Sequence, residues 1–321
     1  MTEETTNANT VSPARDEWKV LFVLAISLLL MEGLVRCFAG SLSIDLRNTI
    51  ATPQTSERIA RAPGNVRTIL VVGNSLARRG VDTALLGGGE HPAEVEVFAP
   101  DGSSVAQWDW GVKRYFANAG AHPDMILVMT GRTHLLDIPA SPETLGAYFV
   151  GAQDLGAALR SMPDGESSLR LLLGAGSHLL ANRDRVRTRI GYSFMPGFET
   201  AWPELTAGKE PGQPDGREQA VGTESLRRLV STARSMGSDL RVFSVPLPEP
   251  YRLPQPVLGF LSETGTPYAD LSVVPGITPE HFPDGYHLDE DGAKIFTRAI
   301  LDSLRRQSTG EKLSGDAPHD R

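Results

Sequence analysis

The chain has 321 residues, of which 40% are hydrophobic and 22% are charged, and these values are typical of a globular protein. Its formal net charge of −8 argues against a general nucleic-acid-binding protein, which would normally be basic, so we expect no nucleic-acid partner. Cys37 is the only cysteine, which excludes an intrachain disulfide. The length predicts one domain of roughly 250 residues with appendages.

An apolar segment near the N-terminus predicts a membrane anchor. Residues 1–17 are polar, and we expect them to be disordered. The uncharged run Val20–Met31 is shorter than the roughly 20 residues that a spanning helix needs. A transmembrane helix over 18–40 fits if Glu32 and Arg36 pair at i,i+4 or reach toward one interface.

Two alternatives to the uncleaved anchor stay open, a cleaved signal peptide and a buried core helix. The leader is long and acidic and no small-residue cleavage site follows, which favours the anchor. Basic residues flank both ends of the span similarly, so their distribution does not decide the orientation.

Strands and helices alternate after the anchor. Residues 41–65 predict a membrane-proximal stalk, 66–306 an α/β domain, and 307–321 a disordered tail. Short apolar runs separated by helical-length segments predict a parallel, doubly wound sheet covered by helices. The expected strands are Thr68–Val72, Glu94–Phe98, Met125–Met129, Leu169–Leu173 and Leu240–Val245, and the expected helices are Ser104–Ala119, Glu143–Ser161, Thr223–Met236 and Asp289–Arg306.

One stretch, 181–222, departs from this alternation. It carries glycines, prolines and aromatic residues without a clear period, so we expect an irregular insertion. It either covers a functional site or is a surface excursion without a role. Its cluster of Arg183, Arg185, Arg187 and Arg189 could hold an anionic polymer, a lipid headgroup or the acidic face of the protein itself.

Ser75 stands directly after the first expected strand, in Gly73-Asn74-Ser75. Ligands of open parallel sheets lie outside the carboxyl ends of the strands, so Ser75 falls at the ligand-binding edge. A serine in this place is also a common helix N-cap, and the tripeptide alone favours that role.

A second segment supplies the partners that a nucleophilic serine needs. Asp284-Gly285-Tyr286-His287 precedes the last expected helix. A carboxylate three residues before a histidine can hold Nδ1–H and leave Nε2 free to take a serine proton. Taken alone, this segment favours a structural role, with Asp289 as the helix N-cap and His287 as an exposed loop residue.

Together the two segments resemble the SGNH (GDSL-type) hydrolase superfamily. Its Gly-Asp-Ser box after the first strand corresponds to Gly73-Asn74-Ser75, and its Asp-x-x-His box corresponds to Asp284-Gly285-Tyr286-His287. The resemblance covers about 66–306 and implies a three-layer α/β/α fold with a flavodoxin-like sheet. It implies Ser75 as nucleophile, His287 as general base and acid, and Asp284 as the residue that orients the histidine.

Weaker boxes place the oxyanion donors by the same analogy. Gly102 follows the second strand, where the family has a glycine whose N–H binds the oxyanion. Gly131 follows the third strand and matches the family's Gly-x-Asn-Asp, but Thr133 stands where the asparagine should be. Loss of one such donor typically costs a factor of about 10² to 10³ in rate. Asn74 replaces the box-one aspartate, which is not a triad member.

No cofactor is expected, because no dinucleotide-binding glycine motif follows the first strand. A metal site of His134, His178 and Asp137 is conceivable, but the spacing is not that of a zinc site, so none is expected.

The expected function is therefore that of a membrane-anchored serine esterase or O-acetyltransferase, with its domain in the periplasm or outside the cell. Anchored proteins that resemble this chain act on acyl groups of surface or exported polysaccharides, often beside a membrane-bound O-acyltransferase, which implies an acylated glycan as substrate. Two alternatives stay open: a catalytically weak or inactive protein that binds or assembles glycans, and a lipid esterase.

Overall fold

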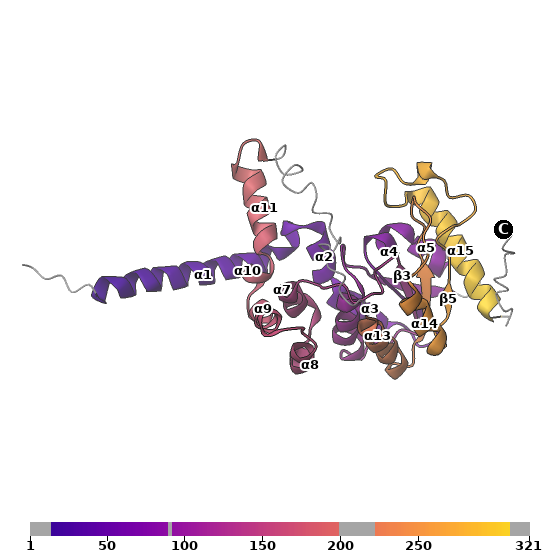
Figure 1. The fold of residues 1–321 in the computed structure, drawn as a ribbon, viewed down its shortest axis with the longest axis horizontal. Helices are drawn as coiled ribbons and strands as arrows, with labels where there is room; N and C mark the ends of the chain where they lie inside the picture. The colour runs from indigo at the N-terminus through magenta and orange to yellow at the C-terminus, as the bar shows by residue number, and fades with distance from the viewer. Residues whose placement is uncertain (1–13, 89–91, 199–221, 309–321) are drawn as a thin grey trace, which may run out of the picture.

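The computed structural model describes residues 14–88, 92–198 and 222–308 (Figure 1). Five strands form one sheet: β1 (Arg67–Val72), β2 (Ala93–Phe98), β3 (Met125–Thr130), β4 (Asp239–Ser244) and β5 (Tyr268–Ala269). The α-helices are α1 (Ala14–Leu42), α2 (Ile44–Ile50), α3 (Thr52–Arg61), α4 (Ser75–Gly80), α5 (Thr83–Gly87), α6 (Val105–Val112), α7 (Pro142–Thr144), α8 (Leu155–Arg160), α9 (Gly165–Gly176), α10 (His178–Ala181), α11 (Arg183–Phe194), α13 (Glu224–Ser235), α14 (Gln255–Glu263) and α15 (Glu290–Ser308). Short π and 3₁₀ turns are η1 (Lys113–Ala117), η2 (Leu145–Phe149), η3 (Ala152–Asp154) and η4 (Pro279–His281).

All strand pairs of the sheet are parallel, and the strand order is β2-β1-β3-β4-β5, the flavodoxin-like order. The expected parallel α/β sheet is therefore confirmed. Val72, the last residue of β1, pairs with Phe98 of β2 and with Val128 of β3. The loops that follow these three strands consequently leave the sheet at one edge, next to one another.

Alternation of side chains along the central strands creates a separate core on each face of the sheet. Leu70 and Val72 of β1 belong to a cluster with α6 and α13, whereas Ile69 and Val71 belong to a second cluster with α4 and α15. Helices thus cover both faces, and the domain has three layers.

Two expected elements differ from the structure. Leu169–Leu173, predicted as a strand, lies within helix α9, because a short apolar run does not distinguish a strand from a helix that is apolar on more than one side. The fifth strand is instead β5, whose two residues are too few to give a sequence pattern. The helix expected over Glu143–Ser161 is interrupted after η2, where Val150 has an extended backbone.

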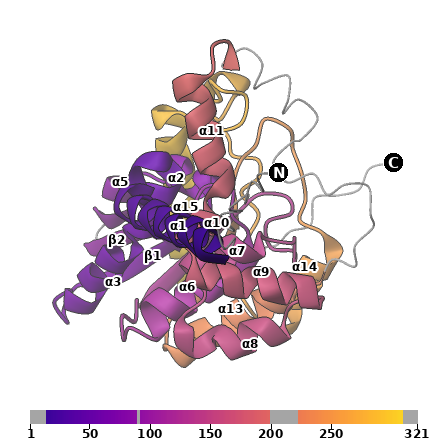
Figure 2. The same cartoon turned by 90° about the vertical axis from the view of Figure 1, so that its left-hand side faces the viewer.

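Helix α1 projects away from the domain and contacts it near its C-terminal end (Figures 1 and 2). Within it, Glu17–Leu42 is long and apolar enough to cross a membrane. Residues 41–65, expected as a stalk, include α2 and α3, and α3 packs against β2.

The expected irregular insertion over 181–222 contains a regular helix, because α11 occupies Arg183–Phe194. Residues 199–221 of the insertion lie outside the described residues, as do residues 1–13 and 309–321 of the two expected disordered ends.

Candidate active site

Ser75 is the first residue of α4, in the tight turn that follows β1. The N-cap is Asn74, whose Oδ1 accepts a hydrogen bond from the Leu76 N–H at 3.0 Å. A Cβ at Gly73 would lie 2.5 Å from Ala77 Cβ, so only glycine fits this turn. The capping role thus falls to Asn74, and the Ser75 hydroxyl is left available for another partner.

The loop before α15 holds Asp284 in a fixed orientation. Its Oδ1 accepts hydrogen bonds from the backbone N–H groups of Tyr286 at 3.1 Å and His287 at 2.7 Å. Gly285, between Asp284 and Tyr286, has a φ of 75°, a left-handed conformation that glycine adopts without strain. This Asx turn points Oδ2 toward the His287 ring, where it lies 2.9 Å from Nδ1.

The two segments meet at the carboxyl edge of the sheet. The Oγ atom of Ser75 lies 2.8 Å from Nε2 of His287, although the residues are 212 positions apart in the chain. Since Nδ1 faces a carboxylate, the proton of a neutral ring belongs on Nδ1, and Nε2 is the acceptor. The sequence-predicted residues Ser75, His287 and Asp284 therefore form one continuous hydrogen-bonded chain.

Hydrogen bonds favour the ionised form of Asp284. The backbone N–H of His287 and then its ring hold the pKa of this carboxyl well below its usual range. Arg79 adds an ion pair, with Nη1 2.9 Å from Oδ2. The carboxylate thus stays negative throughout the range in which histidine titrates.

Arg79 is a site residue that the sequence reasoning did not assign. It stands four positions after Ser75 in the same helix, and this spacing places two side chains on one helix face. The i,i+4 spacing was the available signal, but the position of Asp284 beside that face depends on the tertiary fold.

The loop after β2 lies against the Ser75 turn. The Nδ2 atom of Asn74 donates to the Ser103 carbonyl at 3.3 Å, and Arg78 Nη2 donates to Asp101 Oδ1 at 2.6 Å. Gly102 between these anchors has a φ of 62°. Among the described residues, the N–H groups of Ser75 and Gly102 have no acceptor, so both could donate to a ligand.

Gly131 and Thr133 lie in the loop after β3. The Gly131 N–H donates to His134 Nδ1 at 3.1 Å, and a Cβ at Gly131 would lie 2.8 Å from that nitrogen. Burial lowers the pKa of His134 to about 4, so its ring is neutral and serves the loop as an acceptor. Thr133 is exposed to solvent.

The histidines considered for a metal site belong to different surroundings. His134 Nδ1 is bonded to Gly131, whereas His178 Nδ1 lies 3.4 Å from the Tyr148 hydroxyl and its backbone N–H contacts α1. Asp137 caps the start of α13 by accepting from the N–H of Ser225 at 2.9 Å. Within the described ranges, no three His, Cys, Asp or Glu side chains are grouped to hold a metal ion.

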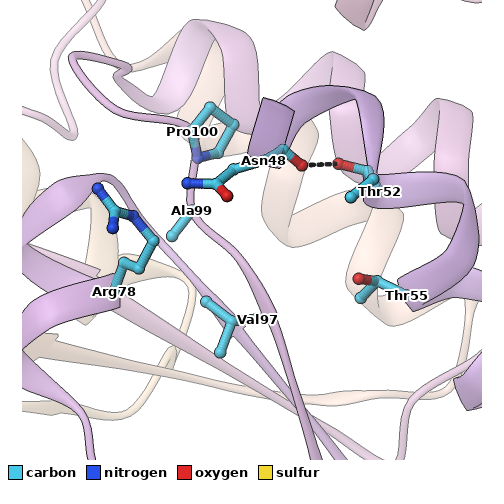
Figure 3. Close-up of a pocket in the computed structure, with 8 residues that line it drawn as sticks. Asn48, Thr52, Thr55, Arg78, Val97, Ala99 and Pro100 are labelled. Carbon is cyan, nitrogen blue, oxygen red and sulfur yellow. Dashed lines mark hydrogen bonds between the residues drawn. The ribbon is translucent and has the colours of Figure 1, made fainter. Parts of the chain in front are cut away.

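A hollow of about 200 Å³, lined by both polar and apolar side chains, opens on the α2–α3 side of the same sheet edge (Figure 3). Arg78 and Pro100 border it, and they stand three positions after Ser75 and two before Gly102. Asn48, Thr52 and Thr55 form its opposite wall. Within this wall the Thr52 hydroxyl donates to the Asn48 carbonyl at 3.5 Å, so part of its hydrogen-bonding capacity is already used (Figure 3).

Comparison with known proteins adds little to this geometry. No model of a known protein family matches the sequence, and no curated protein matches it either. The matching solved structures include a protein from Streptococcus pneumonia provisionally described as a platelet activating factor, with 12% identity over 87% of this chain and 99% of the other. Its TM-score of 0.32 is too low for the similarity to inform the fold or activity of this protein.

Proposed function

We propose that this chain is a serine esterase or O-acyltransferase of the SGNH type, anchored to a membrane by α1. Ser75 is the nucleophile, His287 the general base and acid, and Asp284 the residue that orients and stabilises the imidazolium. The observation that carries the proposal is the Ser75–His287–Asp284 chain, in which a 2.8 Å contact joins Ser75 to His287 from the other end of the domain and a 2.9 Å contact joins His287 to Asp284 of its own loop.

The geometry suits a two-step acyl transfer. Ser75 Oγ attacks the ester carbonyl carbon while its proton passes to His287 Nε2, and the leaving alcohol takes that proton as the acyl–oxygen bond breaks. Water or a second hydroxyl then attacks the acyl-serine, giving its proton to His287, which returns it to Ser75. Asp284, whose pKa is held low, stabilises the positive charge on the ring in both steps.

Stabilisation of the oxyanion falls to backbone N–H groups in this proposal. Those of Ser75 and Gly102 are available among the described residues, and both belong to loops that contact each other. Thr133 occupies the place of the family's asparagine with a shorter side chain, and its hydroxyl is the third candidate donor.

The proposed substrate is an acyl ester on a surface or exported polysaccharide, and the domain is placed in the periplasm or outside the cell. The ion pairs Arg78–Asp101 and Arg79–Asp284 make the surroundings of Ser75 charged, which favours a hydroxyl-rich ligand over a lipid tail. A membrane-bound O-acyltransferase remains the proposed partner, on the family analogy alone.

A second candidate function is a glycan-binding or assembly protein with little or no activity. The exposed Thr133 in place of asparagine favours it, because one oxyanion donor is then weaker or absent. The two functions differ in whether Ser75 is activated, and this difference can be measured.

The test is labelling of the detergent-solubilised full chain with a fluorophosphonate, which reacts covalently with activated serines. We expect labelling of the wild type and its loss in both Ser75→Ala and His287→Ala, with Ser177→Ala as the matched control that stays labelled. Unlabelled wild-type chain from the same preparation is then assayed for acetate release from an O-acetylated glycan and for fatty-acid release from a phospholipid, with fluorophosphonate-treated chain as the inactivated control. Absence of labelling in a folded wild-type chain would contradict the enzymatic proposal and favour the binding protein.

A further inference from the structure

Helix α9 exposes a line of leucines on the side that faces away from the domain. Leu169, Leu172 and Leu173 are 55%, 43% and 45% exposed, and their i, i+3, i+4 spacing places them on one helix face. Leu171 and Gly174, on the opposite face, are buried against the domain. Helix α9 is therefore apolar on both sides, and this leucine stripe has no cover among the described residues.

Other exposed apolar side chains lie on the next two helices. Leu180 of α10 shares with Leu173 a hollow that Glu143, Glu166, Arg170 and Arg183 also line. A further group lies toward the end of α11: Ile190, Tyr192, Phe194 and Met195. Helices α9, α10 and α11 lie on the side of the domain from which α1 projects, and α11 runs crosswise to α1 (Figures 1 and 2). An apolar surface of this extent on a water-exposed domain calls for a covering partner.

The length of the apolar part of α1 indicates what that partner is. The uncharged run Val20–Met31 rises only about 18 Å, at 1.5 Å per residue, whereas the hydrocarbon core is about 30 Å thick. A membrane crossed by α1 must therefore continue past Glu32, to about the level of Ala39. Leu34 and Phe38 point outward there, with Phe38 61% exposed, which suits contact with lipid.

Glu32 fixes the depth of α9 and α10 relative to that membrane. Its carboxylate accepts hydrogen bonds from Ser177 Oγ at 2.8 Å and from the N–H groups of His178 at 2.8 Å and Leu179 at 2.9 Å. Arg36 pairs with Glu32 at 2.6 Å and donates to the Gly176 carbonyl at 3.0 Å. These polar groups satisfy one another, as groups at membrane depth must, and they place the α9–α10 junction beside the last turns of the span.

We propose that the lipid bilayer itself covers the leucine stripe, so that α9 and α10 are embedded in the leaflet on the domain's side as a second membrane contact. The bilayer is favoured as occupant because Glu32 binds the start of α10 at a level of α1 that lies within the span. Charge agrees, since exposed Arg183, Arg187 and Arg189 of α11 would meet anionic headgroups although the chain is acidic overall.

This second contact would fix the height and rotation of the domain above the membrane, which a single helix cannot do. The inference rests on the proposed span by α1 but not on catalysis. It also gives Glu32 and Arg36 a role, because these two charged residues, which interrupt the apolar sequence of α1, bind the junction of α9 and α10 at the same membrane depth.

Depth-dependent fluorescence quenching tests the proposal on the full chain in vesicles of phosphatidylcholine and phosphatidylglycerol with spin labels at defined acyl positions. The single native thiol, exposed Cys37, carries the fluorophore as the marker for α1. In a Cys37→Ser background, Leu172→Cys reports on the stripe, Leu169→Cys repeats the measurement, and exposed Glu263→Cys on α14 is the control.

We expect the probes at positions 37, 169 and 172 to lose most of their fluorescence to shallow acyl spin labels, with severalfold less quenching at 263. Quenching at position 37 but not at 169 and 172 would overturn the second contact. If the probes at 169 and 172 are shielded from water in native membranes but not in the lipid vesicles, the stripe contacts another membrane protein instead of lipid. Absence of quenching at 37 would overturn the span itself. None of these outcomes depends on whether Ser75 reacts with a fluorophosphonate.

Discussion

Arg79 and Asp284 form an ion pair at the carboxylate oxygen that also accepts from the His287 ring. Both Arg79 Nη1 and His287 Nδ1 lie 2.9 Å from Oδ2, while Oδ1 accepts two backbone N–H groups of its own loop. Four donors thus hold one partly exposed carboxylate in a single orientation. In the proposed mechanism this arrangement keeps the His287 ring in the tautomer that accepts the Ser75 proton.

The first prediction concerns the charge of Asp284. The Asp284→Asn variant keeps the size of the side chain but can present an amide N–H to Nδ1, which favours the wrong tautomer of His287. We expect kcat of ester hydrolysis to fall about 10²-fold or more, with little change in KM. Steady-state kinetics of the solubilised chain measure this, and an unchanged kcat would remove Asp284 from the mechanism.

The second prediction concerns Arg79, a positioning residue. Because the Arg79–Asp284 pair is exposed, its removal should cost no more than about 1 kcal/mol, so Arg79→Gln should lower kcat about two- to fivefold. The matched control is Arg61→Gln, which removes the exposed pair with Glu57. Equal kinetics of the two variants would mean that Arg79 does not orient the carboxylate.

The third prediction separates helix capping from chemistry in the Ser75 turn. Asn74 caps α4 and also holds the Ser103 loop, so Asn74→Ala should lower the free energy of unfolding by about 1 to 2 kcal/mol. Ser75→Ala should stay within about 0.5 kcal/mol of the wild type while losing fluorophosphonate labelling. Urea unfolding of both variants checks this, and a comparably large loss for Ser75→Ala would indicate that the serine is structural.

The fourth prediction concerns the weakest part of the proposed oxyanion hole. Replacing the Thr133 side chain with a longer amide donor, as Thr133→Asn, should raise kcat about tenfold. This is less than the factor of about 10² to 10³ in rate that one full oxyanion donor contributes. The companion variant Thr133→Val removes the hydroxyl and should lower kcat. If neither variant changes the rate, position 133 does not contact the oxyanion.

The fifth prediction concerns pH and stability. Burial lowers the pKa of His134 to about 4, while the unfolded chain titrates near its ordinary value of about 6.5. Between these two values only the unfolded state binds the proton, so stability is complete above pH 6.5 and falls as the pH drops toward 4, by about 3 kcal/mol at most.

The variant His134→Gln isolates this effect, since glutamine can accept from the Gly131 N–H without titrating. Its unfolding midpoint in urea should change less between pH 6.5 and 4 than that of the wild type. Parallel pH profiles of the two proteins would show that His134 does not cause the acid sensitivity.

Local sequence patterns were sufficient to predict four of the five strands. Strand β3, Met125–Thr130, is a fully buried apolar run, whereas β2 alternates apolar residues with glutamates. Both patterns depend only on consecutive residues. The same reasoning placed a serine after the first strand and Asp284 and His287 before the last helix, because the position of a short motif next to a strand or a helix can also be seen in consecutive residues.

Contacts between distant segments were decided only by the tertiary structure. The sequence of Leu169–Leu173 predicts a strand, but in the structure it is part of α9, which buries Leu171 and exposes Leu172. Strand β5 is stabilised by its pairing with β4 rather than by its own two residues. The 2.8 Å approach of Ser75 to His287 depends on how the sheet and α15 close together. Glu32, an interruption in the sequence of α1, pairs with Arg36 as its spacing predicts, but its three other partners lie 145 to 147 positions away, in α10 and the residue before it. The sequence by itself determined which residues could form strands, a membrane span and a nucleophile–base pair, because those properties depend on neighbours in the chain. Only the folded chain decided which of these groups meet, because such contacts form between segments whose separation in the sequence carries no local signal.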